Sequence, residues 1–140
     1  MKICGVDIKG SEAILAIARF TKGQLNHVTI DTKKIALADD DESANVKSFF
    51  ELAAGFIRDN DIKHIAIKKR GKKGEFAGGP TTFKIEGILQ MLANCDVMLI
   101  SPQTISAQVR KHSFVMPPTL KKYQYDAYCA ACTAIMKAAE

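Results

Sequence analysis

The chain has 140 residues, and its 47% hydrophobic and 25% charged residues are typical of a globular protein and exclude a disordered one. This length fits one domain over residues 1–140. No apolar run approaches the roughly 18 residues that a membrane span needs, and the N-terminus lacks the features of a signal peptide. We therefore expect a cytoplasmic protein that makes no membrane contact and keeps its cysteines reduced.

The net charge of +5 comes from one segment of the chain. Residues 63–73 carry six of the 20 basic residues with no acidic residue among them, and the rest of the chain is close to neutral. Such a cluster favours a nucleic acid or another polyanion as partner; the alternative is a loop that is merely solvated by its lysines. The candidate binding residues are Lys68, Lys69, Arg70, Lys72 and Lys73.

The first third of the chain predicts three consecutive strands. Residues 2–8 are rich in β-branched side chains and end in a turn, residues 12–20 are apolar enough for a central strand, and residues 25–37 alternate as one longer strand. Short links between consecutive strands predict an antiparallel meander.

Helices and strands alternate over the remainder. Acidic residues at 39–42 and Ser43 suit the start of a helix, whose expected inward positions are Val46, Phe49, Phe50, Ala53, Phe56 and Ile57. Strands are expected at 62–68 and 96–100, and helices at 81–94, 103–111 and about 121–139. The last helix has as its expected inward face Tyr125, Tyr128, Cys129, Cys132, Ile135 and Met136.

This order of elements predicts an α/β fold. Its compact solution is a five-stranded mixed sheet, made of the three-strand antiparallel meander and two parallel strands, with helices on both faces.

Three stretches of the sequence resemble a known family. Residues 5–11 (GVDIKGS), 64–69 (HIAIKK) and 125–131 (YDAYCAA) resemble the RuvC-type Holliday junction resolvases and, more broadly, the ribonuclease H-like superfamily. Residues 76–79 (FAGG) and 83–87 (FKIEG) are similar to those of a small group of uncharacterised bacterial domains of this fold. The resemblance covers nearly the whole chain and implies a ribonuclease H-like fold.

The resemblance also implies a metal-dependent nuclease site. Asp7 matches the first-strand aspartate of the family, and Asp126 matches the second aspartate of its last helix. Two such carboxylates would hold Mg²⁺ or Mn²⁺ for phosphodiester hydrolysis. However, Lys68 stands where the resolvases have a glutamate and Tyr123 where they have a further aspartate. Two of four expected carboxylates are absent, so we expect no cofactor, and Mg²⁺ or Mn²⁺ only if the site is active.

Other acids could replace the missing ligands. Glu75 and Glu86 are the candidates, although we expect Glu75 to be a solvated loop charge and Glu86 to lie on an exposed helix face. Lys68 could instead pair with Asp7 or Asp126, which would replace the metal by an ion pair. We favour this inert arrangement.

The remaining motifs give weaker signals. The glycine–lysine loop lacks the Lys-Ser or Lys-Thr of a P-loop, whereas residues 78–82 (GGPTT) offer backbone N–H groups to an anion at a helix start. Phe76 would stack on a base or simply anchor its loop. Cys129 and Cys132 are expected to be small core residues, because no second cysteine pair or nearby histidine completes a zinc site.

Three hypotheses about function remain open. The first is a protein that binds DNA or RNA through residues 68–73 and carries a degenerate nuclease site. The second is an active Mg²⁺- or Mn²⁺-dependent endonuclease that uses Asp7 and Asp126 with Glu75 or Glu86. The third is a non-catalytic protein-interaction module, such as a homodimer.

Overall fold

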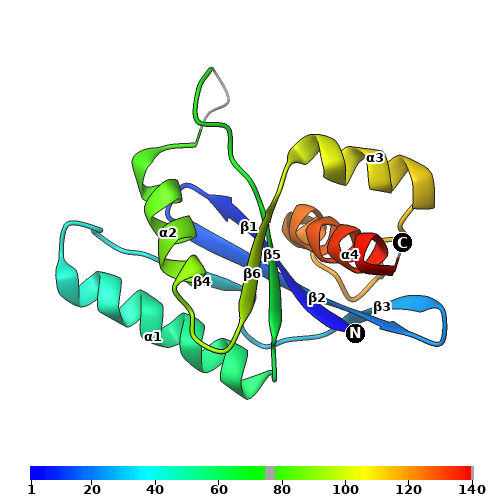
Figure 1. The fold of residues 1–140 in the computed structure, drawn as a ribbon. Coiled ribbons are helices and arrows are strands. Elements are labelled where there is room, and N and C mark those ends of the chain that lie inside the picture. Colours follow the sequence, from blue (N-terminus) through cyan, green and yellow to red (C-terminus); the bar gives the residue numbers. More distant parts are fainter. Residues whose placement is uncertain (75–77, 140) are drawn as a thin grey trace.

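The computed structural model describes residues 1–74 and 78–139, and within them the chain forms a mixed sheet between two layers of helices (Figure 1). The strands are β1 Lys2–Lys9, β2 Glu12–Thr21, β3 Gln24–Val28, β4 Lys34–Ala36, β5 His64–Lys68 and β6 Asp96–Ile100. The helices are α1 Ser43–Asp59, α2 Pro80–Gln90, α3 Pro102–His112 and α4 Tyr125–Ala139, the last preceded by the 3₁₀ turn η1 Lys122–Gln124. None of the helices in the described residues has the length and apolar character that a membrane crossing requires.

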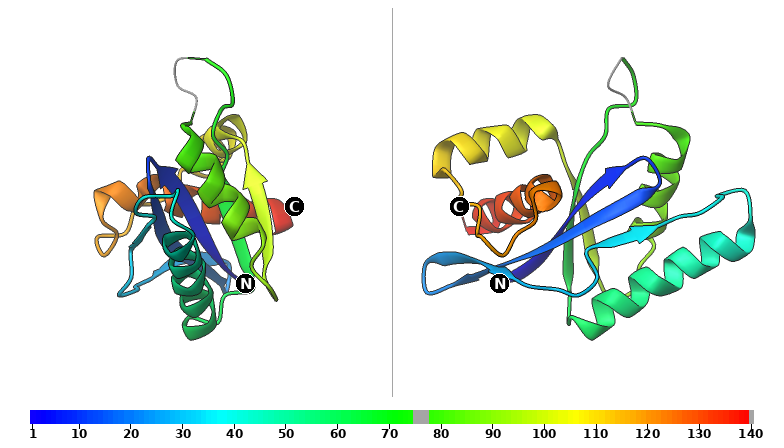
Figure 2. Two further views of the ribbon diagram at one scale, coloured as in Figure 1. Left: turned by 90° about the vertical axis from the view of Figure 1, so that its left-hand side faces the viewer. Right: turned by 180° about the vertical axis from the view of Figure 1, so that it is seen from behind.

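The sheet has the strand order β3-β2-β1-β5-β6. Strands β1, β2 and β3 pair antiparallel, whereas β5 pairs parallel with β1 and β6 pairs parallel with β5. Helices α1 and α2 cover one face and α3 and α4 cover the other (Figure 2). The predicted fold class is therefore confirmed.

The predicted third strand, residues 25–37, is in fact two strands. β3 pairs with the second half of β2 and β4 pairs with its first residues, so both lie against the same long strand. Between them the chain leaves the ladder at residues 29–33 and turns Ile30 into the core with 6% of its surface exposed. The Lys33 ammonium donates to the Ile30 carbonyl at 2.9 Å and holds this bend. The described sheet therefore has six strands instead of five.

Strand alternation divides the core into two layers. Even-numbered residues of β1 pack under α1 and α2, and odd-numbered ones face α3 and α4.

The inward faces of the helices were predicted well except at two positions. Phe50 and Tyr125 were expected to face inward but are 36% and 37% exposed. Both follow an inward residue by one position, about 100° round a helix, at the edge of the apolar stripe. The helix expected at 81–94 is shorter and ends at Gln90.

Gly5 permits an unusually close contact between β1 and α4. A Cβ atom at this position would lie 1.7 Å from the Ala127 carbonyl oxygen and 2.9 Å from the Ala131 nitrogen. Both neighbours are backbone atoms of one helix, so neither can move alone. Only glycine therefore allows α4 to lie this close to the sheet.

Replacing Gly5 by alanine tests this contact. We expect Gly5→Ala to lower the free energy of unfolding by about 3 kcal/mol, because the whole of α4 must shift to relieve the overlap. Gly87→Ala in α2 is the matched control, since its added Cβ meets no atom within 4 Å. That control should be neutral or stabilise the protein by about 0.5–1 kcal/mol through helix propensity. Urea denaturation of the three proteins measures both, and equal stabilities would contradict the contact.

Candidate functional site

The carboxyl ends of β1 and β5 meet below the start of α4. Val6 lies opposite Ile67 in the parallel ladder, so Asp7 and Lys68 are the next pair of neighbours. Alternation turns both side chains toward α4, because Gly5 and Ala66, two residues earlier, already face it. The two residues that the sequence singled out are thus brought together.

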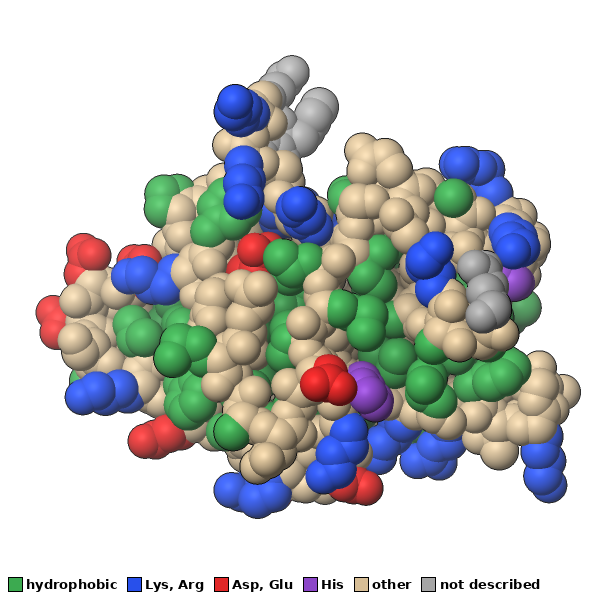
Figure 3. All heavy atoms as spheres, viewed as in Figure 1, with side chains coloured by type: hydrophobic (Ala, Val, Ile, Leu, Met, Phe, Trp, Pro, Cys, Tyr) green, Lys and Arg blue, Asp and Glu red, His purple; other side chains and the backbone are tan. Residues whose placement is uncertain are grey.

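A basic loop, whose described residues are 69–74 and 78–79, leaves the sheet directly after Lys68. It projects from the end of the sheet where β1 and β5 finish. Figure 3 shows Lys and Arg side chains gathered along the projection. Its start is held by a bond from the Lys69 N–H to the Ile100 carbonyl at 2.8 Å, and its base by one from the Gly78 N–H to the Gly71 carbonyl at 2.9 Å. Lys69, Lys72 and Lys73 are exposed. Glu75 and Phe76, considered as a ligand and a stacking residue, lie outside the described residues.

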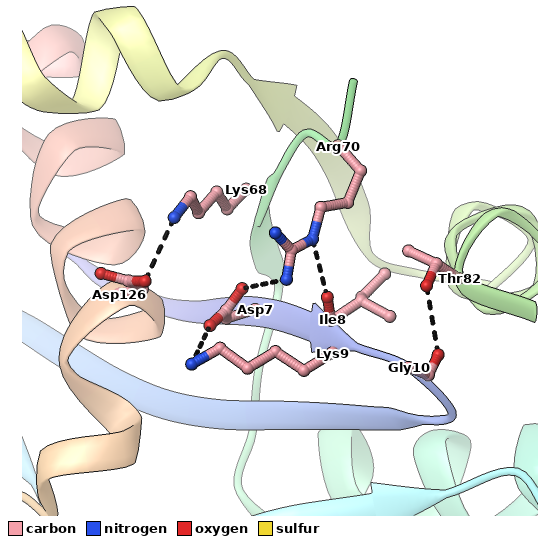
Figure 4. Close-up of polar contacts among 8 residues, drawn as sticks. All are labelled: Asp7, Ile8, Lys9, Gly10, Lys68, Arg70, Thr82 and Asp126. Carbon is pink, nitrogen blue, oxygen red and sulfur yellow. Dashed lines mark hydrogen bonds and ion pairs between the residues drawn. The ribbon is translucent and has the colours of Figure 1, made fainter. Parts of the chain in front are cut away.

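Asp7 is a buried carboxylate held between two cations (Figure 4). It has 0% exposure, and neither of its oxygens accepts a hydrogen bond from the described residues. The Lys9 ammonium lies 3.6 Å from Oδ2, and the Arg70 guanidinium lies 3.7 Å from Oδ1. Arg70 is fixed in turn, because its Nε donates to the Ile8 carbonyl at 2.9 Å. These two cations offset the cost of burying the carboxylate charge.

Lys68 pairs with Asp126, in the first turn of α4. Its Nζ donates to Oδ2 at 3.1 Å, with the two side chains 21% and 50% exposed. The sequence left open whether Lys68 pairs with Asp7 or with Asp126, and the structure has the pair with Asp126. Because the pair is partly solvated, it is expected to stabilise the fold by no more than about 1 kcal/mol.

The residues present do not fit a divalent metal ion. Three cations, Lys9, Lys68 and Arg70, lie around the two carboxylates, and each carboxylate already has a positive partner. Within residues 1–74 and 78–139 no group of three metal-ligating side chains comes together. An added divalent cation would face a positive surplus, which disfavours its binding.

Glu86 is not on an exposed helix face, so that expectation was wrong. It is 8% exposed and follows Thr82 by one helical turn on the inward side of α2. Its Oε2 accepts no hydrogen bond from the described residues. Since α2 covers the opposite face of the sheet from the Asp7 side chain, Glu86 does not join Asp7 and Asp126 as a third ligand.

A cavity of about 450 Å³ lies where α2 begins, and Arg70 is part of its wall. The helix starts within the GGPTT pattern, as expected, and its N-cap Gly79 provides no side-chain cap. The Thr82 hydroxyl donates to the Gly10 carbonyl at 3.1 Å. The two cysteines of the last helix are free thiols. Burial raises the pKa of Cys129 to about 11 and that of Cys132 to about 12, so both stay protonated at neutral pH.

Neither cationic partner of Asp7, Lys9 or Arg70, was predicted from the sequence. Lys9 stands two residues after Asp7 in the same strand, so the period of two placed it on the same face and could have identified it. Arg70 lies in a loop, and no local pattern predicts that its guanidinium turns back to the strand. Its pairing depends on the tertiary fold.

Lys68→Glu tests whether the lysine prevents metal binding. A carboxylate at position 68, next to Asp7 in the ladder and within reach of Asp126, would add a third acid and remove one cation, so we expect saturable Mn²⁺ binding by electron paramagnetic resonance. Lys69→Glu makes the same charge change one residue further on and, like the unmodified protein, should bind none. Failure of Lys68→Glu to bind Mn²⁺ would show that Lys9 and Arg70 suffice to exclude the ion.

Solved structures show what this arrangement resembles. RuvC from Thermus thermophilus has a TM-score of 0.77 at 12% identity, covering 99% of this chain and 96% of that one. The same enzyme in complex with a Holliday junction substrate gives 0.71 at 13% identity, with coverage of 99% and 96%. The fowlpox virus Holliday junction resolvase gives 0.53 at 15% identity, with coverage of 99% and 97%. At these identities the likeness shows the ribonuclease H-like fold, as the sequence resemblance implied.

Comparison at the level of sequence gives a family without a known activity. No curated protein matches the chain. A family model described as "Protein of unknown function (DUF3010)" matches residues 1–134. The chain therefore belongs to the DUF3010 family.

Proposed function

We propose that this chain acts as a single domain that binds nucleic acid through residues 68–73 and the cations beside Asp7, without metal-dependent cleavage. The observation that carries the proposal is the excess of positive charge at the edge where β1 and β5 end. Asp7 and Asp126 are each neutralised by a lysine or arginine, and the loop cations beyond them have no acidic partner among the described ion pairs.

The basic loop borders a groove that suits a phosphate backbone. Residues 69–73 and 101–103 line a cavity of about 470 Å³ between the loop and the start of α3. The positive end of the α3 dipole adds to the charge of the lysines there. A chain of phosphates can exchange its counterions for such a row of cations, which is the main source of sequence-independent binding.

The fold neighbours support nucleic acid as the polyanion. RuvC and the fowlpox virus resolvase, which share this fold over nearly their whole length, have been solved with Holliday junction DNA. For this chain we retain the binding without metal-dependent cleavage, because Lys68 pairs with Asp126 while Lys9 and Arg70 flank Asp7.

Salt dependence and loop variants test the proposal together. We expect binding to a labelled oligonucleotide to weaken steeply as salt rises, since it depends on counterion release. Lys72→Gln/Lys73→Gln should weaken binding and reduce the slope of log K against log salt by about 1 for each phosphate that is no longer neutralised. Fluorescence anisotropy at several salt concentrations measures both effects.

Lys47→Gln/Lys63→Gln provides the matched control. It removes the same charge from two exposed positions away from the loop. Lys47 is on α1, which covers the face of the sheet opposite to α4, and Lys63 precedes β5, at the end of that strand far from the loop. Its slope should equal that of the unmodified protein. Absence of binding, or binding that does not change with salt, would refute the proposal.

An active endonuclease is the second candidate, because the fold neighbours are resolvases. Given the positive surplus beside Asp7, we expect no cleavage of branched DNA or of an RNA–DNA hybrid in Mn²⁺. Gel analysis of labelled substrates checks this. Cleavage that disappears in Asp7→Asn would establish the endonuclease instead, whereas cleavage that persists in Asp7→Asn indicates a contaminating nuclease.

A further inference from the structure

An exposed aromatic ring lies beside the ion-pair cluster. Tyr123 is 37% exposed and precedes Asp126 by three residues in the continuous helical segment formed by η1 and α4. Residues three apart leave a helix on the same side. Lys34 of β4, which contacts the ring, lies opposite Ile14 of β2, and Ile14 lies opposite Asp7 of β1. The ring is therefore about two strands from Asp7, on the side of β1 away from Lys68.

The turn that carries Tyr123 is fixed to the sheet. The neighbouring Gln124 has 0% exposure, and its Nε2 donates to the Leu15 carbonyl at 2.8 Å. Its Oε1 accepts from the Lys121 N–H at 2.9 Å. Because both ends of this side chain are bound, the Tyr123 backbone is held in place, and a ligand that contacts the ring need not order it first.

Among the described residues, one cation contacts the ring, and three more lie around Asp7 and Asp126. The Lys34 ammonium lies 4.3 Å from the Tyr123 centroid, and Lys34 pairs with Ile14 across β4 and β2, on the face covered by α4. The cations around Asp7 and Asp126 are Lys9, Lys68 and Arg70. The acids there are Asp7 and Asp126, each with its own cationic partner, and Glu12 opposite Lys9.

We infer that Tyr123 stacks on an unpaired nucleobase while the neighbouring cations bind the adjacent phosphates, so that the chain prefers a single-stranded polynucleotide to a duplex. This inference rests on the proposed function and specifies its substrate class. The bases of a duplex are stacked on each other and offer no free face, whereas an unpaired base can stack on an aromatic side chain. A base that displaces the Lys34 ammonium from the ring also frees that lysine for a phosphate.

Binding measurements with single strands and duplexes of equal length test the inference. Tyr123→Ala should weaken single-strand binding roughly 5- to 100-fold and leave duplex binding unchanged, and Tyr123→Phe should stay within about twofold of the unmodified protein. Tyr125→Ala is the matched control, because Tyr125 has the same 37% exposure. It leaves the helix about 200° away from Tyr123, so its removal should have no effect.

Tyrosine fluorescence gives an independent readout. The chain has three tyrosines and no tryptophan, and Tyr128 is buried with 1% exposure. Stacking should quench the emission when a single strand binds. Tyr123→Phe should lose most of this quenching although its affinity is retained.

The outcomes separate this inference from the proposed function. Salt-sensitive binding that is unaffected by Tyr123→Ala, or weakened equally for duplex and single strand, would overturn the stacking role and leave the proposed function standing. An equal effect of Tyr125→Ala would overturn the assignment to Tyr123. If the unmodified protein binds neither DNA nor RNA oligonucleotides at low salt, the proposed function fails, and this inference fails with it.

Discussion

The close approach of α4 to β1 at Gly5 is the constraint on which the site depends. With no side chain at this position, the Ala127 backbone lies directly against the strand. The first turn of α4 is thereby brought over the carboxyl ends of β1 and β5, where Asp126 reaches Lys68. A larger residue at position 5 would lift the helix and separate the two charges.

The burial of Asp7 determines which charges gather where β1 and β5 end. A carboxylate with no exposed surface must be neutralised, and at Asp7 this is achieved by Lys9 and Arg70. Since Lys68 neutralises Asp126 as well, the cluster has more positive than negative groups. On electrostatic grounds, such a cluster favours an anion over a further cation.

How far the sequence predicted this structure depends on the range of the interactions. Period-two and helical patterns are local, so the fold class and the bounds of β6 were predicted from them. The neighbourhood of Asp7 and Lys68 was implied by the resemblance to the resolvases. The break between β3 and β4 was not, because the turn of Ile30 into the core is a tertiary effect. Burial of Glu86 and the return of Arg70 to Asp7 also depend on contacts between distant segments.

The cations near the carboxyl ends of β1 and β5 fall into two groups, those on strands and those in the loop. Lys9, Lys34 and Lys68 belong to strands, and their backbones are fixed by the sheet, like the Gln124-anchored turn beside them. Lys72 and Lys73 belong to a loop, which the bond from the Gly78 N–H to the Gly71 carbonyl closes at its base. If the proposed function holds, phosphate contacts of Lys72 and Lys73 would contribute affinity that does not depend on base sequence. Discrimination between nucleic acids would then have to come from the cations on the strands and from the turn that carries Tyr123.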